Sequence, residues 1–447
     1  MSNCDDVTLI FCVWVSWYVL VFLFAISIES NQWETTRNAL SAKMVTFDPV
    51  YKALSDEKLL GWQSGAVSAL WKSRTRKFKV QSSGNRAEDS KKFTPEEGKY
   101  FKFYTDVLPL YAPGLFVKSF KQELFIDIGS APGGLSKYLI TACGWRGYAF
   151  SLSPSEGGLE MRYSNPSSLL FSMSNMTREN EWSRVVSLCA KEGFTDVHFV
   201  NTGVVVDFGQ VDADGGGSSE MTCRSIGSSI SQMLIILKCL KSGGSAMWIH
   251  SLSHLDTLFF FLQYIVPCFD SIRLLNTLAP ARSPIYIIMS GFKKGSAAAA
   301  TFEKALLRNN GTVSPTTVPM WQVDDFAVVE RIMNENPSLT NDLHAIWNQK
   351  KECLRETRLF AEKKFSECGN DDNKFNATSQ ACHTVLAGVE QRLSPTLLEE
   401  VRDRKTHTNT LISAAGVCGV SSKESVKTQG SLLTIPKSFG PPPRKKL

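Results

Sequence analysis

The hydrophobic and polar positions between residues 124 and 293 follow two alternating patterns. Short apolar runs of strand length occupy 124–129, 147–153, 168–174, 196–203, 245–252, 271–279 and 283–293. Longer segments with helical spacing lie between most of them, at 134–144, 182–193, 229–244 and 258–269. Strands that alternate with helices form parallel βαβ units, and helices then cover the faces of the sheet. The pattern therefore predicts an α/β fold with a doubly wound, mostly parallel sheet.

The pattern changes on both sides of this region. Residues 29–97 are polar and basic, and the apolar positions at 96–111 have helical spacing that leads into a domain placed at 98–295. Residues 296–393 are predicted as a helical extension, since 297–307 and 323–365 are charged and moderately amphipathic. Residues 394–447 are polar and end in GPPPRKKL, which predicts a disordered tail.

The N-terminus carries an uncharged hydrophobic stretch at residues 7–28 that is long enough to span a bilayer. The acidic start MSNCDD lacks the basic region of a signal peptide. If the stretch inserts, the flanking charges favour a membrane anchor with a cytoplasmic body. If it does not insert, it is a buried helix or an artefact of the chosen start codon, and the chain is cytoplasmic or nuclear.

Composition excludes few classes of function. The chain has 447 residues, of which 43% are hydrophobic and 21% charged, as in ordinary globular proteins. Its 11 cysteines form no CxxC pair, which argues against a disulfide framework and a structural zinc site and favours reduced, buried thiols. No metal site is predicted. The net charge of +6 permits an acidic partner without requiring one.

One cluster of basic residues lies within the stretch KSRTRKFKVQSS, beside Trp71 and Phe78. Its members are Lys72, Arg74, Arg76, Lys77 and Lys79. Basic and aromatic residues that alternate in this way bind nucleic acid in many proteins, so the cluster is a candidate RNA contact. A solvated basic surface is the alternative. The oligomeric state cannot be predicted.

The sequence DIGSAPGG, at 127–134, joins the first predicted strand to the first helix of the domain. A glycine turn between a strand and a helix is typical of nucleotide-binding sites in doubly wound folds. Gly129 is expected where a Cβ would clash, and Gly133 and Gly134 allow a ligand or the helix to approach closely. The dinucleotide fingerprint G-x-G-x-x-G is absent, because Ser130, Ala131 and Pro132 intervene.

This turn resembles the D-x-G-x-x-P-G-G motif of FtsJ-like (RrmJ-type) methyltransferases, which depend on S-adenosylmethionine. Three further stretches resemble the same family in the same order: GYAFSLSPSEGG, QMLIILKCLKSGGSAMWIH and ARSPIYIIMSGFK. The second-strand stretch is similar to a divergent fungal FtsJ-like group. The resemblance covers about 115–294 and implies the Rossmann-like fold of class I methyltransferases.

The resemblance also implies the residues that bind S-adenosylmethionine. In the opening turn they are Asp127, Gly129, Ser130, Pro132, Gly133 and Gly134, with the Asp127 carboxylate near the cofactor's amino group. The second strand of such folds usually ends in an acid that binds the ribose, and Ser151 takes that place here. The third usually supplies an Asp near the adenine, and Asn175 is the corresponding residue.

The family deprotonates a ribose 2′-hydroxyl with a Lys-Asp-Lys-Glu set, and this chain keeps only part of it. Lys118 matches the first Lys, with Lys121 as the second choice. Thr202, beside Asn201, stands in place of the Asp. His250 replaces the central Lys as a candidate base, and Pro284 stands in place of the Glu.

Two functions follow from these observations. The first is methyl transfer from S-adenosylmethionine to RNA ribose, with Lys118 and His250 as catalytic candidates. The second is a catalytically inactive descendant that binds the cofactor or RNA. A nicotinamide-dependent reductase is disfavoured, since both G-x-G-x-x-G and Tyr-x-x-x-Lys are missing.

Overall fold

The computed structural model describes residues 39–63, 103, 105, 122–204, 218–252, 254–276, 284–308, 313–314, 317–323 and 325–366. The chain divides into two units, Met1–Leu398 and Glu399–Leu447, and every described residue belongs to the first. The hydrophobic stretch at 7–28, the basic cluster at 72–79, Lys118 and the tail at 394–447 lie outside the described residues. Predictions about them stay predictions.

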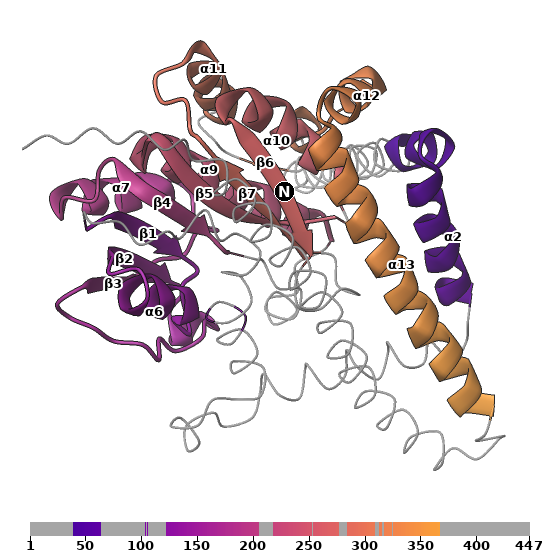
Figure 1. The fold of residues 1–447 in the computed structure, drawn as a ribbon, viewed down its shortest axis with the longest axis horizontal. Helices are drawn as coiled ribbons and strands as arrows, with labels where there is room; N and C mark the ends of the chain where they lie inside the picture. The colour runs from indigo at the N-terminus through magenta and orange to yellow at the C-terminus, as the bar shows by residue number, and fades with distance from the viewer. Residues whose placement is uncertain are drawn as a thin grey trace, which may run out of the picture. The chain divides into compact units, whose positions relative to one another are not determined.

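A seven-stranded sheet forms the centre of the described unit, in the order β3-β2-β1-β4-β5-β7-β6 (Figure 1). The strands are β1 Leu124–Ile128, β2 Arg146–Ser151, β3 Leu169–Met173, β4 Val197–Thr202, β5 Leu240–Ser251, β6 Ser271–Asn276 and β7 Pro284–Ser290. The pairs from β3 to β5 are parallel, whereas β7 runs antiparallel to both β5 and β6. The predicted doubly wound, mostly parallel sheet is confirmed, and its strand order is that of the class I methyltransferase fold.

The helices of the domain follow the predicted pattern closely. They are α6 Gly134–Thr141, α7 Glu181–Lys191, α9 Ser218–Cys239 and α10 Leu255–Cys268, with a short 3-10 helix η2 at Pro154–Glu156. The helix predicted at 229–244 differs at both ends, because α9 already begins at Ser218 and β5 begins at Leu240. Leu240 pairs with Val197 of β4, and an irregularity in the β4–β5 register accommodates the extra residues before Gly244.

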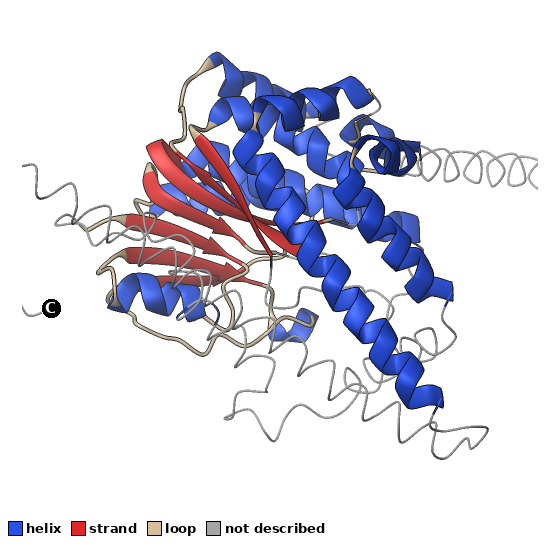
Figure 2. Cartoon of the chain, turned by 45° about the vertical axis from the view of Figure 1, so that its right-hand side comes forward, coloured by secondary structure: helices blue, strands red, loops and turns tan. Residues whose placement is uncertain are grey.

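Side chains alternate between the two faces of the sheet, and each face has its own cluster of buried residues. Phe125 and Met247 belong to the cluster on the α6 face, together with Leu139 of that helix. Ile126 and Trp248, their neighbours in sequence, belong to the cluster that includes α7, α9 and α10. Figure 2 shows the sheet with α6 on one side and most of the other described helices on the opposite side. The face of the sheet to which a strand side chain points therefore determines which groups it can contact.

Helices from both flanks of the domain pack on its β6 edge or on other helices of the unit. They are α2 Pro49–Gln63 from the predicted N-terminal extension, then α11 Ala297–Leu306, α12 Phe326–Glu335 and α13 Pro337–Ser366, with the 3-10 helix η4 at Val318–Trp321. In α2, Tyr51 packs edge-on against Trp347 of α13, with ring centroids 5.1 Å apart. In α13, Asp342 accepts two hydrogen bonds from Arg273 of β6, at 2.7 and 2.8 Å. The helical segments predicted at 297–307 and 323–365 are confirmed, while the domain boundaries stay predictions.

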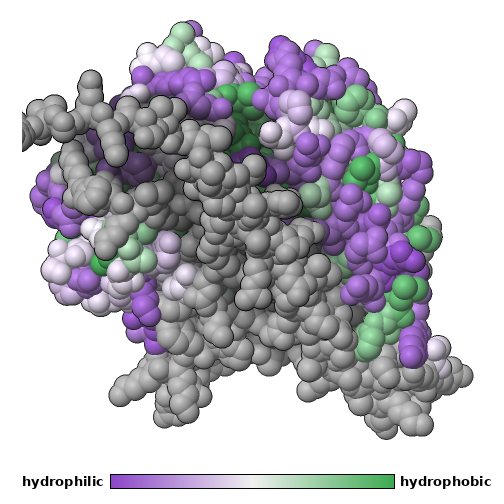
Figure 3. Space-filling view, in the orientation of Figure 1, coloured by the Kyte–Doolittle hydropathy of each residue, from purple (hydrophilic) through white to green (hydrophobic). Residues whose placement is uncertain are grey.

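The polar extension predicted before the domain thus contributes part of the core. Tyr51 and Leu54 are buried in the same cluster as the large helical face of the sheet. The outer surface of α2 and α13 is mixed in character, and Figure 3 shows hydrophobic residues among hydrophilic ones on this side. Leu59, Leu60 and Leu359 are among the exposed large hydrophobic side chains there.

Candidate functional site

The centre of the sheet contains the point where the strand order reverses. From β1 the chain proceeds through β2 to β3 on one side, then crosses back to β4 on the other side. Ligands of doubly wound sheets bind at the carboxyl ends of the strands beside such a switch point. The glycine turn at 129–133 follows directly after β1, so it lies at this position.

The turn is tight and needs glycine at two positions. Gly129 has φ 77° and Gly133 has φ 100°, both in the left-handed region that side chains disfavour. A Cβ on Gly129 would come within 2.9 Å of the carbonyl carbon of Gly203, which follows β4. The predicted clash at Gly129 is confirmed. The backbone amides of Gly129 and Ser130 donate to the carbonyl oxygen of Phe150, which ties the turn to β2.

The rest of the turn is packed against the fold. Ser130, Pro132 and Gly134 are all buried. Ser130 also donates from its Oγ to the carbonyl oxygen of Phe150, at 3.2 Å. Gly134 begins α6, so the chain passes from β1 into the helix within a few residues.

Asp127 is fully buried at the end of β1 and joins three elements. Its Oδ2 accepts a hydrogen bond from Ser136 Oγ of α6 at 2.6 Å. Its Oδ1 accepts one from Asn201 Nδ2 of β4 at 2.7 Å. Burial raises the pKa of the Asp127 carboxyl, and the hydrogen bonds from Ser136 and Asn201 oppose that shift. The carboxylate predicted to meet the cofactor's amino group is thus engaged by the protein itself.

Asn201 completes this arrangement with an acceptor of its own. Its side chain is 2% exposed and points to the α6 face, since Asn201 pairs with both Asp127 and Met247. Nδ2 donates to Asp127, while Oδ1 is buried and has no hydrogen-bond partner among the described residues. A buried carbonyl oxygen without a donor costs about 1–3 kcal/mol, so this atom marks a place for an N–H group.

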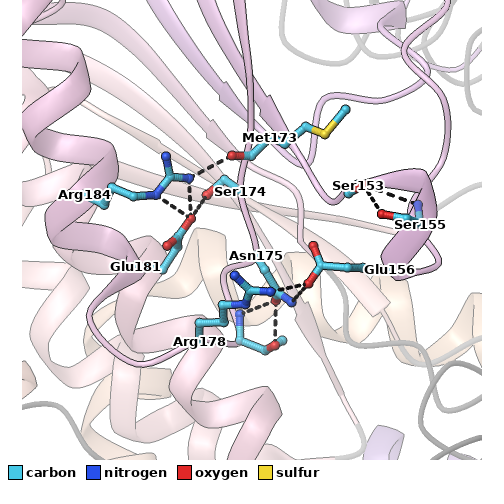
Figure 4. Close-up of polar contacts among 10 residues, drawn as sticks. Ser153, Ser155, Glu156, Met173, Ser174, Asn175, Arg178, Glu181 and Arg184 are labelled. Carbon is cyan, nitrogen blue, oxygen red and sulfur yellow. Dashed lines mark hydrogen bonds and ion pairs between the residues drawn. The ribbon is translucent and has the colours of Figure 1, made fainter.

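The loops after β2 and β3 are joined by a second polar cluster (Figure 4). Asn175 donates from Nδ2 to Glu156 Oε1 at 3.1 Å, and Arg178 donates to the same oxygen at 2.7 Å. Asn175 Oδ1 accepts from the amide and hydroxyl of Thr177. Ser151 is buried at the end of β2, and its carbonyl oxygen accepts from the amide of Ser174. Asn175 therefore connects the two loops.

Glu156 is a candidate that the sequence reasoning missed. The sequence predicted the hydroxyl of Ser151 where such folds place an acid after the second strand. The structure has this carboxylate five residues after Ser151, in η2, with a side chain that is 34% exposed. The signal was an acid a short distance beyond the strand, and it was missed because only the residues directly at the strand end were considered.

The segment that follows η2 lies on the glycine turn. The amide of Arg162 donates to the carbonyl oxygen of Pro132 at 3.1 Å. A Cβ on Gly133 would come within 2.8 Å of Tyr163 Cβ and 3.0 Å of Met161 Cε. The close approach predicted at Gly133 is therefore made by side chains of this chain.

His250 lies in a different environment from the one expected for a base. Asn201 pairs with Met247, and His250, three residues further along β5, points to the opposite face. There it packs between Trp248 and Phe261 of α10, with ring centroids 4.7 and 6.3 Å away. Burial lowers the pKa of His250 to about 3, so the ring is neutral at physiological pH.

The structure thus brings all eight predicted cofactor residues to one edge of the sheet. Asp127, Gly129, Ser130, Pro132, Gly133, Gly134, Ser151 and Asn175 all lie at the carboxyl ends of β1, β2 and β3 or in the turn that follows β1. His250 is separated from them by the sheet itself. Thr202 faces away from Asp127 as well, with its Oγ1 donating to the carbonyl oxygen of Met247 at 3.0 Å.

Two further kinds of feature were sought within the described residues. No group of three or more His, Cys, Asp or Glu side chains is placed there to hold a metal ion. Within the same residues no helix combines the length and hydrophobicity that crossing a membrane requires. Six of the cysteines are described, and all six are buried, as the sequence predicted.

The sequence matches no protein-family model and no curated protein. Among solved structures, similarity is found to precorrin-6y C5,15-methyltransferase from Geobacter metallireducens GS-15. The identity is 14% over 40% of this chain and 83% of that one, with a TM-score of 0.23. A second is human N-acetylserotonin methyltransferase in complex with SAM, at 12% identity over 58% and 71% of the chains and a TM-score of 0.25.

A third similar structure comes from work on the conversion of a disulfide bond into a thioacetal group during echinomycin biosynthesis. It is 12% identical over 44% of this chain and 86% of that chain, with a TM-score of 0.22. At such values these similarities carry no information about the ligand or the reaction of this chain. The fold assignment rests on the strand order given above.

Proposed function

We propose that this chain binds S-adenosylmethionine at the carboxyl edge of β1, β2 and β4, as a methyltransferase of the class I fold. The observation that carries the proposal is the Pro-Gly-Gly turn at the switch point of a sheet whose β7 is antiparallel between β5 and β6. The turn resembles the FtsJ-like motif, and the strand order is the one which that resemblance implies. When bound, the cofactor would supply an electrophilic methyl group on a sulfonium.

The residues at this edge have the chemistry to hold such a ligand. The unpartnered Oδ1 of Asn201 is an acceptor for an N–H donor such as the cofactor's amino group. The partly exposed Glu156 carboxylate suits the two ribose hydroxyls, as acids do in related folds. Asp127 orients Asn201 through its hydrogen bond, so its role is to position the acceptor.

The proposed methyl acceptor is an RNA ribose 2′-hydroxyl, by resemblance to the FtsJ-like family. The basic cluster at 72–79 would hold the phosphate backbone, and Lys118 would contact the hydroxyl. The proposed base His250 fits this scheme poorly, because its ring points to the face opposite Asp127 and Asn201.

A second candidate function is cofactor binding without methyl transfer, and one observation favours it. At the positions that correspond to the family's Asp, central Lys and Glu, this chain has Thr202 beside Asn201, His250 and Pro284. Thr202, Asn201 and Pro284 are not general bases, and the buried His250 ring lies on the face opposite Asp127. Of the proposed catalytic set, Lys118 alone would then provide this chemistry.

A methyl-transfer assay separates the two functions. The full chain is incubated with methyl-labelled S-adenosylmethionine and a capped, structured RNA, and incorporation is compared with that of Lys118→Ala and His250→Gln. The methyltransferase is supported by transfer that Lys118→Ala abolishes and His250→Gln leaves intact. Binding of S-adenosylhomocysteine without any transfer selects the second function. If the folded chain binds no S-adenosylhomocysteine, both functions are wrong.

A further inference from the structure

The segment at 159–165, here called the strap, follows η2 and lies across the Pro132–Gly133 end of the glycine turn. It contacts the turn through main chain and side chains. The amide of Arg162 donates to the carbonyl oxygen of Pro132 at 3.1 Å. Met161 and Tyr163 are half-buried and pack against the core cluster on the α6 face.

The strap leaves no space on this side of Gly133. A single added carbon would lie 2.8 Å from Tyr163 Cβ and 3.0 Å from Met161 Cε, both closer than ordinary van der Waals contact. Any ligand that approaches the Cα of Gly133 from this direction therefore meets the strap first. Gly133, which was expected to allow the close approach of a ligand or the helix, is therefore covered by the strap.

Both ends of the strap are fixed to the fold. Before it, the amide of Gly158 donates to the carbonyl oxygen of Ser153 at 3.0 Å. At its last residue, Asn165 accepts from the amide of Leu169 at 2.7 Å with its carbonyl oxygen, and from Ser167 Oγ at 2.7 Å with Oδ1. The ends of the strap are thus fixed, and its middle is held by the Arg162 hydrogen bond and the side chains of Met161 and Tyr163. A segment held in this way can lift without unfolding the sheet.

We propose that the strap is a lid that closes the glycine turn in the ligand-free chain and is displaced when S-adenosylmethionine binds. This inference rests on the proposed function, since it assumes the cofactor at this turn. The closed strap and the ligand compete for the same side of Gly133. The apparent affinity is then reduced by the fraction of molecules in which the strap is closed.

Calorimetric titration with S-adenosylhomocysteine tests the competition. Met161→Ala and Tyr163→Ala remove the side chains that hold the strap down, and Leu159→Ala is the matched control, because Leu159 is exposed in the same segment. We expect the first two variants to bind about 3- to 10-fold more tightly than the unaltered chain, and the control to bind as the unaltered chain does. Weaker binding by both variants would mean that Met161 and Tyr163 contact the ligand, and would contradict the lid proposal.

Trypsin cleavage after Arg162, followed by mass spectrometry of the released peptides, provides a readout independent of affinity. A lifted strap exposes the Arg162–Tyr163 bond, so S-adenosylhomocysteine is expected to accelerate this cut several-fold. In Met161→Ala the cut should be fast even without ligand. Ligand that protects the bond would contradict the proposal.

The two proposals fail in different ways. If the unaltered chain binds S-adenosylhomocysteine and neither affinity nor cleavage responds to Met161→Ala or Tyr163→Ala, only the lid is wrong. If the unaltered chain and both variants all fail to bind, the proposed function is wrong and the lid falls with it. If binding appears only in the variants, both proposals are supported.

Discussion

Asp127 shows how one buried side chain sets the geometry of the candidate site. Its carboxylate accepts from Ser136 of α6 and from Asn201 of β4, so the strand, the following helix and the neighbouring strand are held together directly below the turn. The same bond fixes which way the Asn201 amide points. The carboxylate thus determines where the unpartnered Oδ1 of Asn201 lies.

Replacing Asp127 by Ala should destabilise the fold as well as the site. The variant leaves the Ser136 hydroxyl and the Asn201 amide without their acceptor, and the loss of two buried hydrogen bonds costs about 2–4 kcal/mol. Urea unfolding measures this change. Ser136→Ala, which removes one of the two bonds, is the control and should cost clearly less. Equal unfolding free energies for all three chains would contradict this role.

His250 should make the protein sensitive to acid. Burial lowers its pKa from the ordinary 6.5 to about 3, so below pH 6.5 the unfolded chain takes up a proton that the native chain does not. The stability that neutral His250 contributes is present above pH 6.5 and is lost as the pH falls toward 3.

Urea unfolding of the native chain and His250→Gln at pH 7.5 and pH 5 measures this effect. The stability difference between the two pH values should be smaller in the variant by as much as about 2 kcal/mol. An identical pH dependence in both chains would show that His250 is accessible to protons, which would revive its candidacy as a base.

At the residue scale, the sequence predicted the turn better than the contacts around it. Gly129 and Gly133 could be recognised because left-handed backbone demands glycine. The direction of His250 could not be predicted from the motif, because it depends on the register of β5 against β4. Met161 and Tyr163 gave no signal either, since nothing local shows that they pack on Gly133.

Among the helices, α13 places a lysine amine inside the protein. Lys350 is 4% exposed, and its Nζ donates to Asn276 Oδ1 at the end of β6, at 3.0 Å. Burial lowers the pKa of Lys350 from 10.5 to about 7, and Lys58 of α2 adds to the shift. This helix therefore covers the edge of the sheet with a buried amine that loses its charge near neutral pH.

Lys350→Met should stabilise the chain at pH 7 and change its response to alkali. Between pH 7 and 10.5 the unfolded chain keeps a proton that the native chain has released, so native stability rises with pH across this window. The variant removes this dependence, up to about 1.4 kcal/mol per pH unit. Unfolding free energies at pH 7 and pH 9 test it, with Lys351→Met on the same helix as the control. A variant with the slope of the native chain would contradict the buried position.

The elements themselves were predictable where their pattern was strong. The strands and helices between 124 and 293 were found because buried strands and amphipathic helices have distinct periods. The pairing of α2 with α13 was not predicted, because their contacts join residues about 300 positions apart, such as Glu57 and Arg358, at 2.7 Å. Such long-range partners leave no local trace in either segment.

Considered as a whole, the described unit is a class I methyltransferase sheet extended by helices from both of its flanks. Alternating strands and helices predicted the doubly wound sheet, and the resemblance to the FtsJ-like family supplied its class. The prediction is weakest for the family's catalytic set, since Thr202, His250 and Pro284 occupy three of its four positions. Whether this chain binds the cofactor and whether it transfers a methyl group are therefore separate questions.

Calorimetric titration of the full-length chain with S-adenosylhomocysteine tests the central claim most directly. We predict saturable binding at one site per chain, weakened about tenfold or more by Glu156→Gln and by Asn201→Ala, since each loses a hydrogen bond to the ligand. Lys351→Met, far from the turn in sequence and on α13, should bind as the native chain does. A folded chain that gives no binding heat, or affinities unchanged by both site variants, would contradict a cofactor site at the carboxyl edge of β1, β2 and β4.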